Sequence, residues 1–194
     1  LRLIFASSCI LLGLVFWQNR PEYVPAELPI IGETTSVSGS AKDLGARDDL
    51  CSQLSQPDGY LLFVGTIDMS SRSFNEGFFQ TANAEDGIFF EFEASTLVRL
   101  GVRLADGTTE RVKFKLLRNT NAFNFLILIQ GSGRIRLVGK ETDEIFEIGK
   151  IAISCDDWRI GSANESSDFG GNITMSISAG SSVADANETL DNYI

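Results

Sequence analysis

The acidic side chains give this chain its clearest capacity for chemistry. Glu91 and Glu93 stand two residues apart in an alternating run, a spacing that places both carboxylates on one face of a β-strand, about 7 Å apart. Glycoside hydrolysis uses such a carboxylate pair, one member as acid and the other as base or nucleophile. The alternative is a solvated strand face, because Phe90 and Phe92 alternate with the two glutamates and would occupy the buried face. The alternation favours this second interpretation.

The composition excludes much of the remaining catalytic chemistry. The chain has 194 residues, no histidine and three cysteines. It therefore has no Ser-His-Asp or Cys-His centre, no His-ligated metal site, and too few thiolates for a four-cysteine metal site. The formal net charge of -10 repels nucleic acid. We expect a non-enzymatic protein with no catalytic residues, no metal or cofactor, and no nucleic-acid partner.

The elements that must position any site are predicted to be β-strands. Between residues 60 and 178, apolar and polar side chains alternate with a period of two, which is typical of half-buried antiparallel strands. Asp106-Gly107 and Gly131-Ser132-Gly133 supply the flexible residues that tight hairpins need. Strands are predicted over residues 60–67, 77–81, 88–93, 97–104, 111–117, 124–130, 134–138, 144–148, 150–154 and 172–178. This pattern predicts an all-β, antiparallel, two-sheet jelly-roll sandwich.

The N-terminal segment is predicted to enter a membrane. Residues 3–17 carry no charge and would form a helix of about 22 Å, so their length also fits a signal-peptide core. Trp17 followed by polar residues is typical of an interfacial anchor, which favours a transmembrane helix over residues 1–18. Its lipid-facing side chains would be Leu3, Ile4, Phe5, Ile10, Leu11, Leu12, Leu14, Val15, Phe16 and Trp17.

The segments on either side of the β region are predicted to lie outside the sandwich. Residues 19–57 contain Pro21, Pro25 and Pro29 and then a stretch rich in Gly, Ser and Thr, which predicts an extended linker. A turn or two of helix is compatible with residues 41–54. The sandwich would span residues 58–180, and residues 181–194 would form an acidic, solvated tail.

Two cysteines flank most of the predicted sandwich. A bridge between Cys51 and Cys155 would close a loop of about a hundred residues and stabilise the fold by about 3 to 5 kcal/mol. An exported domain is the compartment in which such a bridge forms. The alternative is two buried free thiols, and the sequence leaves both open.

Three segments of the β region resemble the laminin G-like, or concanavalin A-like, jelly roll. They cover residues 85–108, 123–141 and 157–178, and the resemblance extends over residues 58–180. A strand pair closes over a turn at Gly107, and a later signature has the form Ile-Gly, seven residues, Phe-x-Gly-x-Ile. The residues that match this signature are Ile160, Gly161, Phe169, Gly171 and Ile173. The Trp-His pair usual in the family is absent.

The resemblance implies a jelly roll and leads to three hypotheses: a calcium site, a carbohydrate-binding surface and a catalytic strand. Calcium is a common cofactor of the family, and its candidate ligands here are Asp68, Asp86, Asp106, Asp156 and Asp157. Their spacing selects no metal, and turn aspartates usually accept hydrogen bonds from their own backbone. Lectin-like members bind carbohydrate, for which Trp158 and Tyr60 are the candidate aromatic residues. Glu91 and Glu93 resemble the catalytic strand of bacterial laminarinases only in part, because Thr96 occupies the position of the third acid.

The sequence as a whole favours a binding or structural role. The leading hypothesis is a single-pass, membrane-anchored accessory subunit whose β domain lies on the exported side and docks on the integral proteins of a membrane complex. An energy-converting or photosynthetic assembly is one setting, by analogy alone. The alternative is a surface module that binds carbohydrate or another ligand, and the third hypothesis is a glycoside hydrolase.

Overall fold

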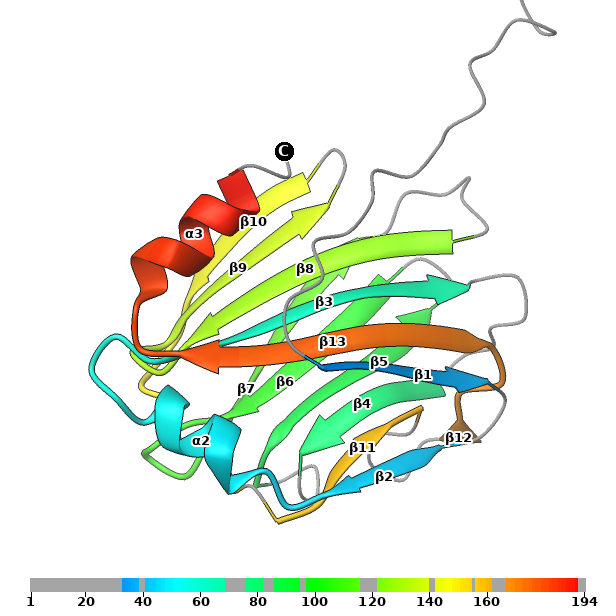
Figure 1. The fold of residues 1–194 in the computed structure, drawn as a ribbon, viewed down its shortest axis with the longest axis horizontal. Helices are drawn as coiled ribbons and strands as arrows, with labels where there is room; N and C mark the ends of the chain where they lie inside the picture. Colours follow the sequence, from blue (N-terminus) through cyan, green and yellow to red (C-terminus); the bar gives the residue numbers. More distant parts are fainter. Residues whose placement is uncertain are drawn as a thin grey trace, which may run out of the picture.

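The computed structural model describes residues 33–38, 41–68, 76–81, 86–94, 97–115, 122–139, 142–154, 156–161 and 167–191. Within these ranges the chain folds as a β-sandwich of two sheets (Figure 1). The first sheet contains, in spatial order, β1 (Glu33–Ser38), β13 (Asn172–Gly180), β3 (Tyr60–Asp68), β8 (Ala122–Gln130), β9 (Arg134–Gly139) and β10 (Thr142–Glu147). The second contains β2 (Lys42–Gly45), β11 (Trp158–Ile160), β4 (Glu76–Thr81), β5 (Ile88–Ala94), β6 (Leu97–Arg103) and β7 (Thr109–Lys115). The short strand β12 (Ser167–Asp168) pairs with β4 in parallel, and the other pairs are antiparallel.

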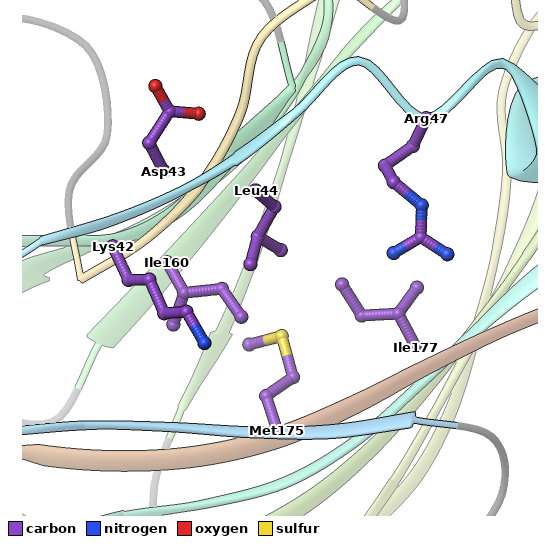
Figure 2. A pocket seen from close by; sticks show the side chains of 7 residues that line it. All are labelled: Lys42, Asp43, Leu44, Arg47, Ile160, Met175 and Ile177. Atoms are coloured by element: carbon purple, nitrogen blue, oxygen red, sulfur yellow. The ribbon is translucent and has the colours of Figure 1, made fainter.

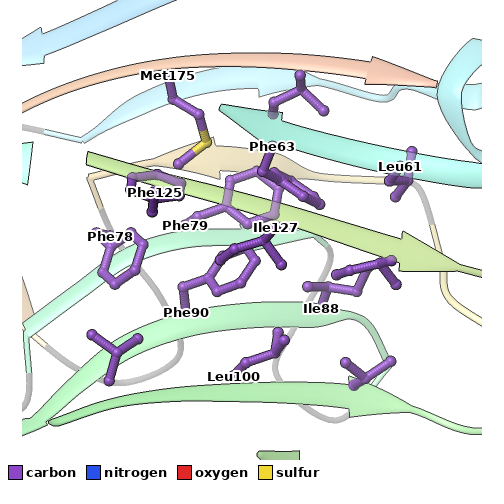
Figure 3. Close-up of a cluster of buried hydrophobic side chains, with 14 of the residues drawn as sticks. Leu61, Phe63, Phe78, Phe79, Ile88, Phe90, Leu100, Phe125, Ile127 and Met175 are labelled. Carbon is purple, nitrogen blue, oxygen red and sulfur yellow. The ribbon is translucent and has the colours of Figure 1, made fainter. Parts of the chain in front are cut away.

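The two sheets meet over a core rich in phenylalanine (Figure 3). The ring of Phe63, from the first sheet, lies 5.0 Å from Phe79 and 5.2 Å from Phe90 of the second sheet, measured between ring centroids. Both contacts are edge-to-face, an arrangement that aromatic pairs prefer. The alternating strands thus place their apolar side chains on a shared interior, which confirms the predicted all-β, two-sheet architecture.

The predicted strands and hairpins agree with most of the observed ones. Gly107 and Gly133 have φ values of 87° and 105° in the turns after β6 and β8, where a left-handed backbone favours glycine. Residues 150–154 do not form a strand, and within them Ile151 makes only an isolated bridge to Leu104. The sequence analysis also missed β11 and β12, which are three and two residues long.

The boundary between linker and sandwich lies earlier than expected. Residues 33–54 were predicted as linker, yet β1 pairs with β13 and β2 pairs with β11. Helix α2 (Asp48–Leu54) follows and buries Leu50 and Leu54 against the core. These short elements are stabilised by partners more than a hundred residues away in sequence, so their local composition does not reveal them.

The acidic end of the chain is also part of the fold. Helix α3 (Val183–Asp191) lies across the outer face of the first sheet, where it buries Ala186 and Leu190 (Figure 1). The sheet presents a second apolar cluster there, formed by Leu62, Val64, Leu126, Leu128 and Val138. Residues 183–191 are therefore a docked helix and not the solvated tail that the charges suggested, because the apolar stripe of the helix has a matching surface.

The predicted membrane anchor cannot be compared with the fold, since residues 1–32, with Leu3 to Trp17 among them, lie outside the described residues. Among the helices that are described, none combines the length and the apolar character that crossing a membrane requires.

Candidate binding cleft

The two glutamates considered as a catalytic pair each form an ion pair with a cationic side chain. Glu91 is buried, and its Oε1 accepts hydrogen bonds from Nε and Nη2 of Arg99 on the neighbouring strand. Glu93 accepts a hydrogen bond of 2.7 Å from the Lys113 ammonium on β7. The structure thus places both carboxylates on the outer face of the second sheet as partners in ion pairs.

The aspartates considered as calcium ligands lie on separate turns and have separate partners. Asp106 accepts hydrogen bonds from the backbone and hydroxyl of Thr108, at 2.8 and 2.7 Å, and these lower the pKa of its carboxyl. Asp68 contacts the side chain of Asn172, and Asp86 contacts that of Arg103. Asp156 contacts the side chain of Ser154, and Asp157 contacts that of Arg159. Within the described ranges, no three acidic or cysteine side chains are gathered in a way that could hold a metal ion.

The residues of the laminin G-like signature come together at one end of the sandwich. Ile160, Phe169 and Ile173 are buried in the main core. Gly161 has a φ of 87°, and its carbonyl accepts a 2.8 Å hydrogen bond from the Phe169 amide. Gly171 lies so close to the Phe169 ring that a Cβ atom would come within 2.6 Å of it. These residues pack the core and its turns, and among them Ile160 also lines a cleft described below.

Neither candidate aromatic residue forms an exposed surface for sugar stacking. Trp158 is fully buried and packs edge-on against Phe79, at 5.7 Å between centroids. Tyr60 is half-buried beside the cluster under α3, and burial, followed by the charge of Asp185, raises the pKa of its hydroxyl. Neither of the two aromatic residues proposed to stack on a sugar ring is therefore available for that contact.

Cys51 is disulfide-bonded. It lies on α2 and packs against the main core. Cys155, the predicted partner, lies outside the described residues, so the pairing of Cys51 with Cys155 stays a prediction.

A cleft opens between the two sheets, at the edge where β2 and β11 of one sheet lie opposite β13 of the other (Figure 2). Its volume is about 260 Å³. Four apolar side chains form its floor and walls, and three charged residues stand at its mouth. The lining residues are Leu44, Ile160, Met175, Ile177, Lys42, Asp43 and Arg47.

The alternation of β2 explains which charges face the cleft. Leu44 packs against the core, whereas Asp43 pairs in register with Arg159 on the outer side of the sheet. Figure 2 shows the Lys42 ammonium and the Arg47 guanidinium directed toward the floor, and the Asp43 carboxylate directed away from it. Asp43 is also engaged locally, because its Oδ1 accepts a 2.7 Å hydrogen bond from the Gly45 amide. The two charged side chains directed toward the floor of the cleft are therefore both cations, and Asp49 offsets the charge of Arg47.

Arg47 is held in position by Asp49. Its Nε and Nη2 atoms donate to the two carboxylate oxygens of Asp49, each at 3.0 Å, which is the planar, two-point geometry that a guanidinium favours. These hydrogen bonds, and the positive charge, lower the pKa of Asp49. Lys42 is exposed and has no ionic partner among the residues that the structure describes.

The cleft is not predicted from the sequence, because Lys42, Leu44 and Arg47 lie in the segment expected to be a linker. The four residues Lys42 to Gly45 are too few for alternation to be recognised, and the other wall of the cleft comes from β13. The pairing of β2 with β11 joins β2 to the second sheet, and the stacking of the two sheets places it opposite β13.

Comparison with known proteins identifies the fold and no family. No family model matches the chain, and no curated protein matches it in sequence. The receptor-binding domain of a botulinum neurotoxin C/D mosaic serotype superposes with a TM-score of 0.59 at 11% identity, covering 87% of this chain and 44% of that one. The binding domain of botulinum neurotoxin DC, solved with rat synaptotagmin II, gives 0.56 at 8% identity, covering 88% and 45%. A botulinum neurotoxin type C structure whose description concerns interaction with two ganglioside molecules gives 0.53 at 10% identity, covering 88% and 46%. The chain spans less than half the length of each, and at these identities the likeness shows that it shares their jelly-roll-like β-sandwich.

Proposed function

We propose that this chain is a non-catalytic ligand-binding module, and that its cleft takes a small organic anion with an apolar body. The observation that carries the proposal is the arrangement in Figure 2, in which two cations at the mouth point toward an apolar floor. Ligand sites are typically concave and mostly apolar, with a few polar groups that fix orientation. A carboxylate at the mouth would contact Lys42 and Arg47, while an aliphatic chain would lie against Met175 and Ile177.

The surroundings of the other candidate groups support binding over catalysis. Glu91 and Glu93 are engaged with Arg99 and Lys113, so neither is poised as a free acid or base. Among the solved structures that share the fold, one is a binding domain in complex with rat synaptotagmin II, and the description of another concerns interaction with two ganglioside molecules. A binding role for this sandwich is consistent with these descriptions. The cleft and the proposed ligand rest on the residues of this chain alone.

Isothermal titration of the full chain with octanoate tests the proposal. We expect measurable binding to octanoate and weaker binding to the uncharged analogue octanamide, because only the carboxylate engages the cations. Lys42→Glu should weaken octanoate binding by about tenfold, which corresponds to about 1.4 kcal/mol.

The matched control is Lys150→Glu, which reverses an equally exposed lysine away from the cleft. Binding that is equal for octanoate and octanamide, or that falls equally in the two variants, would show that the cleft does not select an anion. No binding to wild type at millimolar octanoate would refute the proposal outright.

The membrane hypothesis concerns a different part of the chain and is compatible with a binding role. We propose that residues 1–18 anchor the domain to a bilayer, with the sandwich on the exported side, and that it docks there on integral membrane proteins. The apolar run of residues 3–17 supports this proposal. Fractionation of the expressed full chain checks it: recovery in the carbonate-washed membrane pellet is expected, and recovery in the supernatant contradicts it.

A further inference from the structure

On the side away from the cleft, each sheet ends in a strand that has no further partner strand among the described residues. In the described part of the chain, β7 is the last strand of one sheet and β10 is the last strand of the other. The cleft lies toward the other edges of the same two sheets, between β2 and β11 of one and β13, next to the edge strand β1, of the other. Edge strands present unpaired backbone groups, which makes them sites for pairing with another strand.

The outer face of β7 is cationic. Val112 and Phe114 point into the core, so the alternating residues Arg111, Lys113 and Lys115 lie on the outside and are exposed. Lys113 forms an ion pair with Glu93. Arg111 and Lys115 have no ionic partner among the described residues.

The outer face of β10 has the complementary pattern. Its Phe146 packs against the core, so Asp143, Ile145 and Glu147 lie on the outside. Ile145 is 47% exposed and is the one large apolar side chain so exposed among the described residues. The Glu147 side chain is 71% exposed and lies 3.4 Å from Arg134, measured from Oε1 to Nε.

We propose that two copies of this chain pair these edges, β7 of each copy with β10 of the other, about a two-fold axis that runs along the strands. In antiparallel register, Arg111 then faces Glu147 and Lys115 faces Asp143. Lys113 faces Ile145, whose side chain packs along the aliphatic part of the lysine. Asp143 and Glu147, the outer-face acids of β10, are thus each opposite a cation.

The strand directions allow this pairing. Figure 1 shows β3 and β4 running in opposite directions. Three antiparallel steps lead from β3 to β10 and three lead from β4 to β7, so β10 and β7 also run in opposite directions. A two-fold axis along the strands preserves direction and exchanges the two layers. It therefore places β7 of one copy antiparallel to β10 of the other, with outer faces on the same side.

A second copy suits this surface better than an unrelated acidic peptide. One copy supplies both complementary edges, and the two-fold arrangement closes on itself and leaves neither edge open. Pairing of like edges is disfavoured, because β7 against β7 opposes cations and β10 against β10 opposes acids. The charges thus select the unlike pair.

Sedimentation velocity of the full chain, in detergent where its N-terminal segment requires it, tests the proposal with two variants. The β7 variant is Arg111→Glu, and the β10 variant is Glu147→Lys. We expect wild type to dimerise as its concentration rises from about 1 to about 300 µM, and each variant to dimerise at least about tenfold more weakly. An equimolar mixture should restore the dimer, because one junction is then wild type and in the other the Arg111→Glu and Glu147→Lys substitutions form the same ion pair with reversed charges.

Circular dichroism shows whether each variant is folded, and Lys150→Glu is the control for net charge. A wild-type chain that stays monomeric overturns the proposal, even where it binds an added acidic peptide. A dimer that persists in both variants, or a mixture that stays monomeric, also overturns it. The result is independent of octanoate binding, since the cleft lies at the other side of the sandwich.

Discussion

Glu91 shows why the type of a residue does not determine its role. Its position beside Glu93 suggested a catalytic pair, but the register of β5 and β6 places it directly opposite Arg99. The Glu91 side chain is 5% exposed and that of Arg99 is 30% exposed, so the arginine compensates a carboxylate that the fold has removed from water. Burial, and then the charge of Arg111, lowers the pKa of Arg99.

Replacing Glu91 by Gln should therefore lower stability. The guanidinium would lose its anionic partner while the site stays buried, and we expect the free energy of unfolding to fall by about 1 to 3 kcal/mol. Urea denaturation measures this change. Glu110→Gln is the matched control, because Glu110 is exposed on β7, and an equal effect of the two substitutions would contradict this account.

Arg136 joins β9, β10 and α3 through one guanidinium. Its side chain is 12% exposed, and it donates to Asp143 at 2.9 Å and to Asp191 at 2.7 Å. It also donates to the Asn187 amide oxygen at 3.1 Å. Hydrogen bonding from Arg136, and then its charge, lowers the pKa of Asp143, and the same contacts raise the pKa of Arg136.

This ion pair should make stability depend on pH on the acid side. The pKa of Asp143 is lower in the folded protein than its ordinary value of 3.8, so its contribution is complete above that value and is lost as the pH falls through the folded pKa. We expect unfolding midpoints measured from about pH 5 downward to fall less steeply in Asp143→Asn than in wild type. Equal slopes in the two proteins would refute the assignment.

Among the elements, α3 shows how an acidic segment becomes part of a fold. Leu190 is fully buried, and Ala186 is 2% exposed, against the outer cluster of the first sheet. Beneath them, β8 has apolar residues on both faces, as the unbroken apolar run from Phe125 to Ile129 predicts. A strand covered on both faces requires an element on its outer side, and α3 is that element.

Substitution of Leu190 by Ala should release this helix. The expected loss is about 2 to 5 kcal/mol from the buried side chain and the cavity that it leaves. Hydrogen exchange of residues 183–191 should accelerate more than exchange in β5, because the buried residues of the helix belong to the outer cluster and not to the main core. Glu188→Ala, an exposed position on the same helix, is the control and should leave exchange unchanged. Uniform acceleration throughout the chain would show that α3 does not open on its own.

At the scale of the whole molecule, Cys51 connects α2 to another part of the chain. Peptide mapping without reduction should recover a peptide pair joining Cys51 to Cys155. Reduction of that bridge should lower the free energy of unfolding by about 3 to 5 kcal/mol, because it frees a loop of about a hundred residues in the unfolded chain. A Cys51–Cys9 peptide pair would contradict the predicted connectivity.

The bounds of the sandwich were the feature of the fold that the sequence predicted least well. Long alternating strands such as β6 and β7 were predicted nearly in full, because alternation of apolar and polar residues over seven positions is enough to recognise a strand. The cleft was not predicted, because it combines Lys42 from a four-residue strand with Met175 from β13. The strands that bring its two walls together are too short to be recognised without their partners.

The sequence by itself determined the all-β class, the positions of the longer strands, the Gly107 turn and the absence of histidine chemistry, since each depends on composition or on neighbouring residues. The tertiary structure was needed to show that residues 33–38, 41–54 and 183–191 belong to the sandwich, that Glu91 is compensated by Arg99, and that Lys42 and Arg47 face an apolar floor. These features arise between residues far apart in the chain, where burial and pairing are set by the register and stacking of the two sheets.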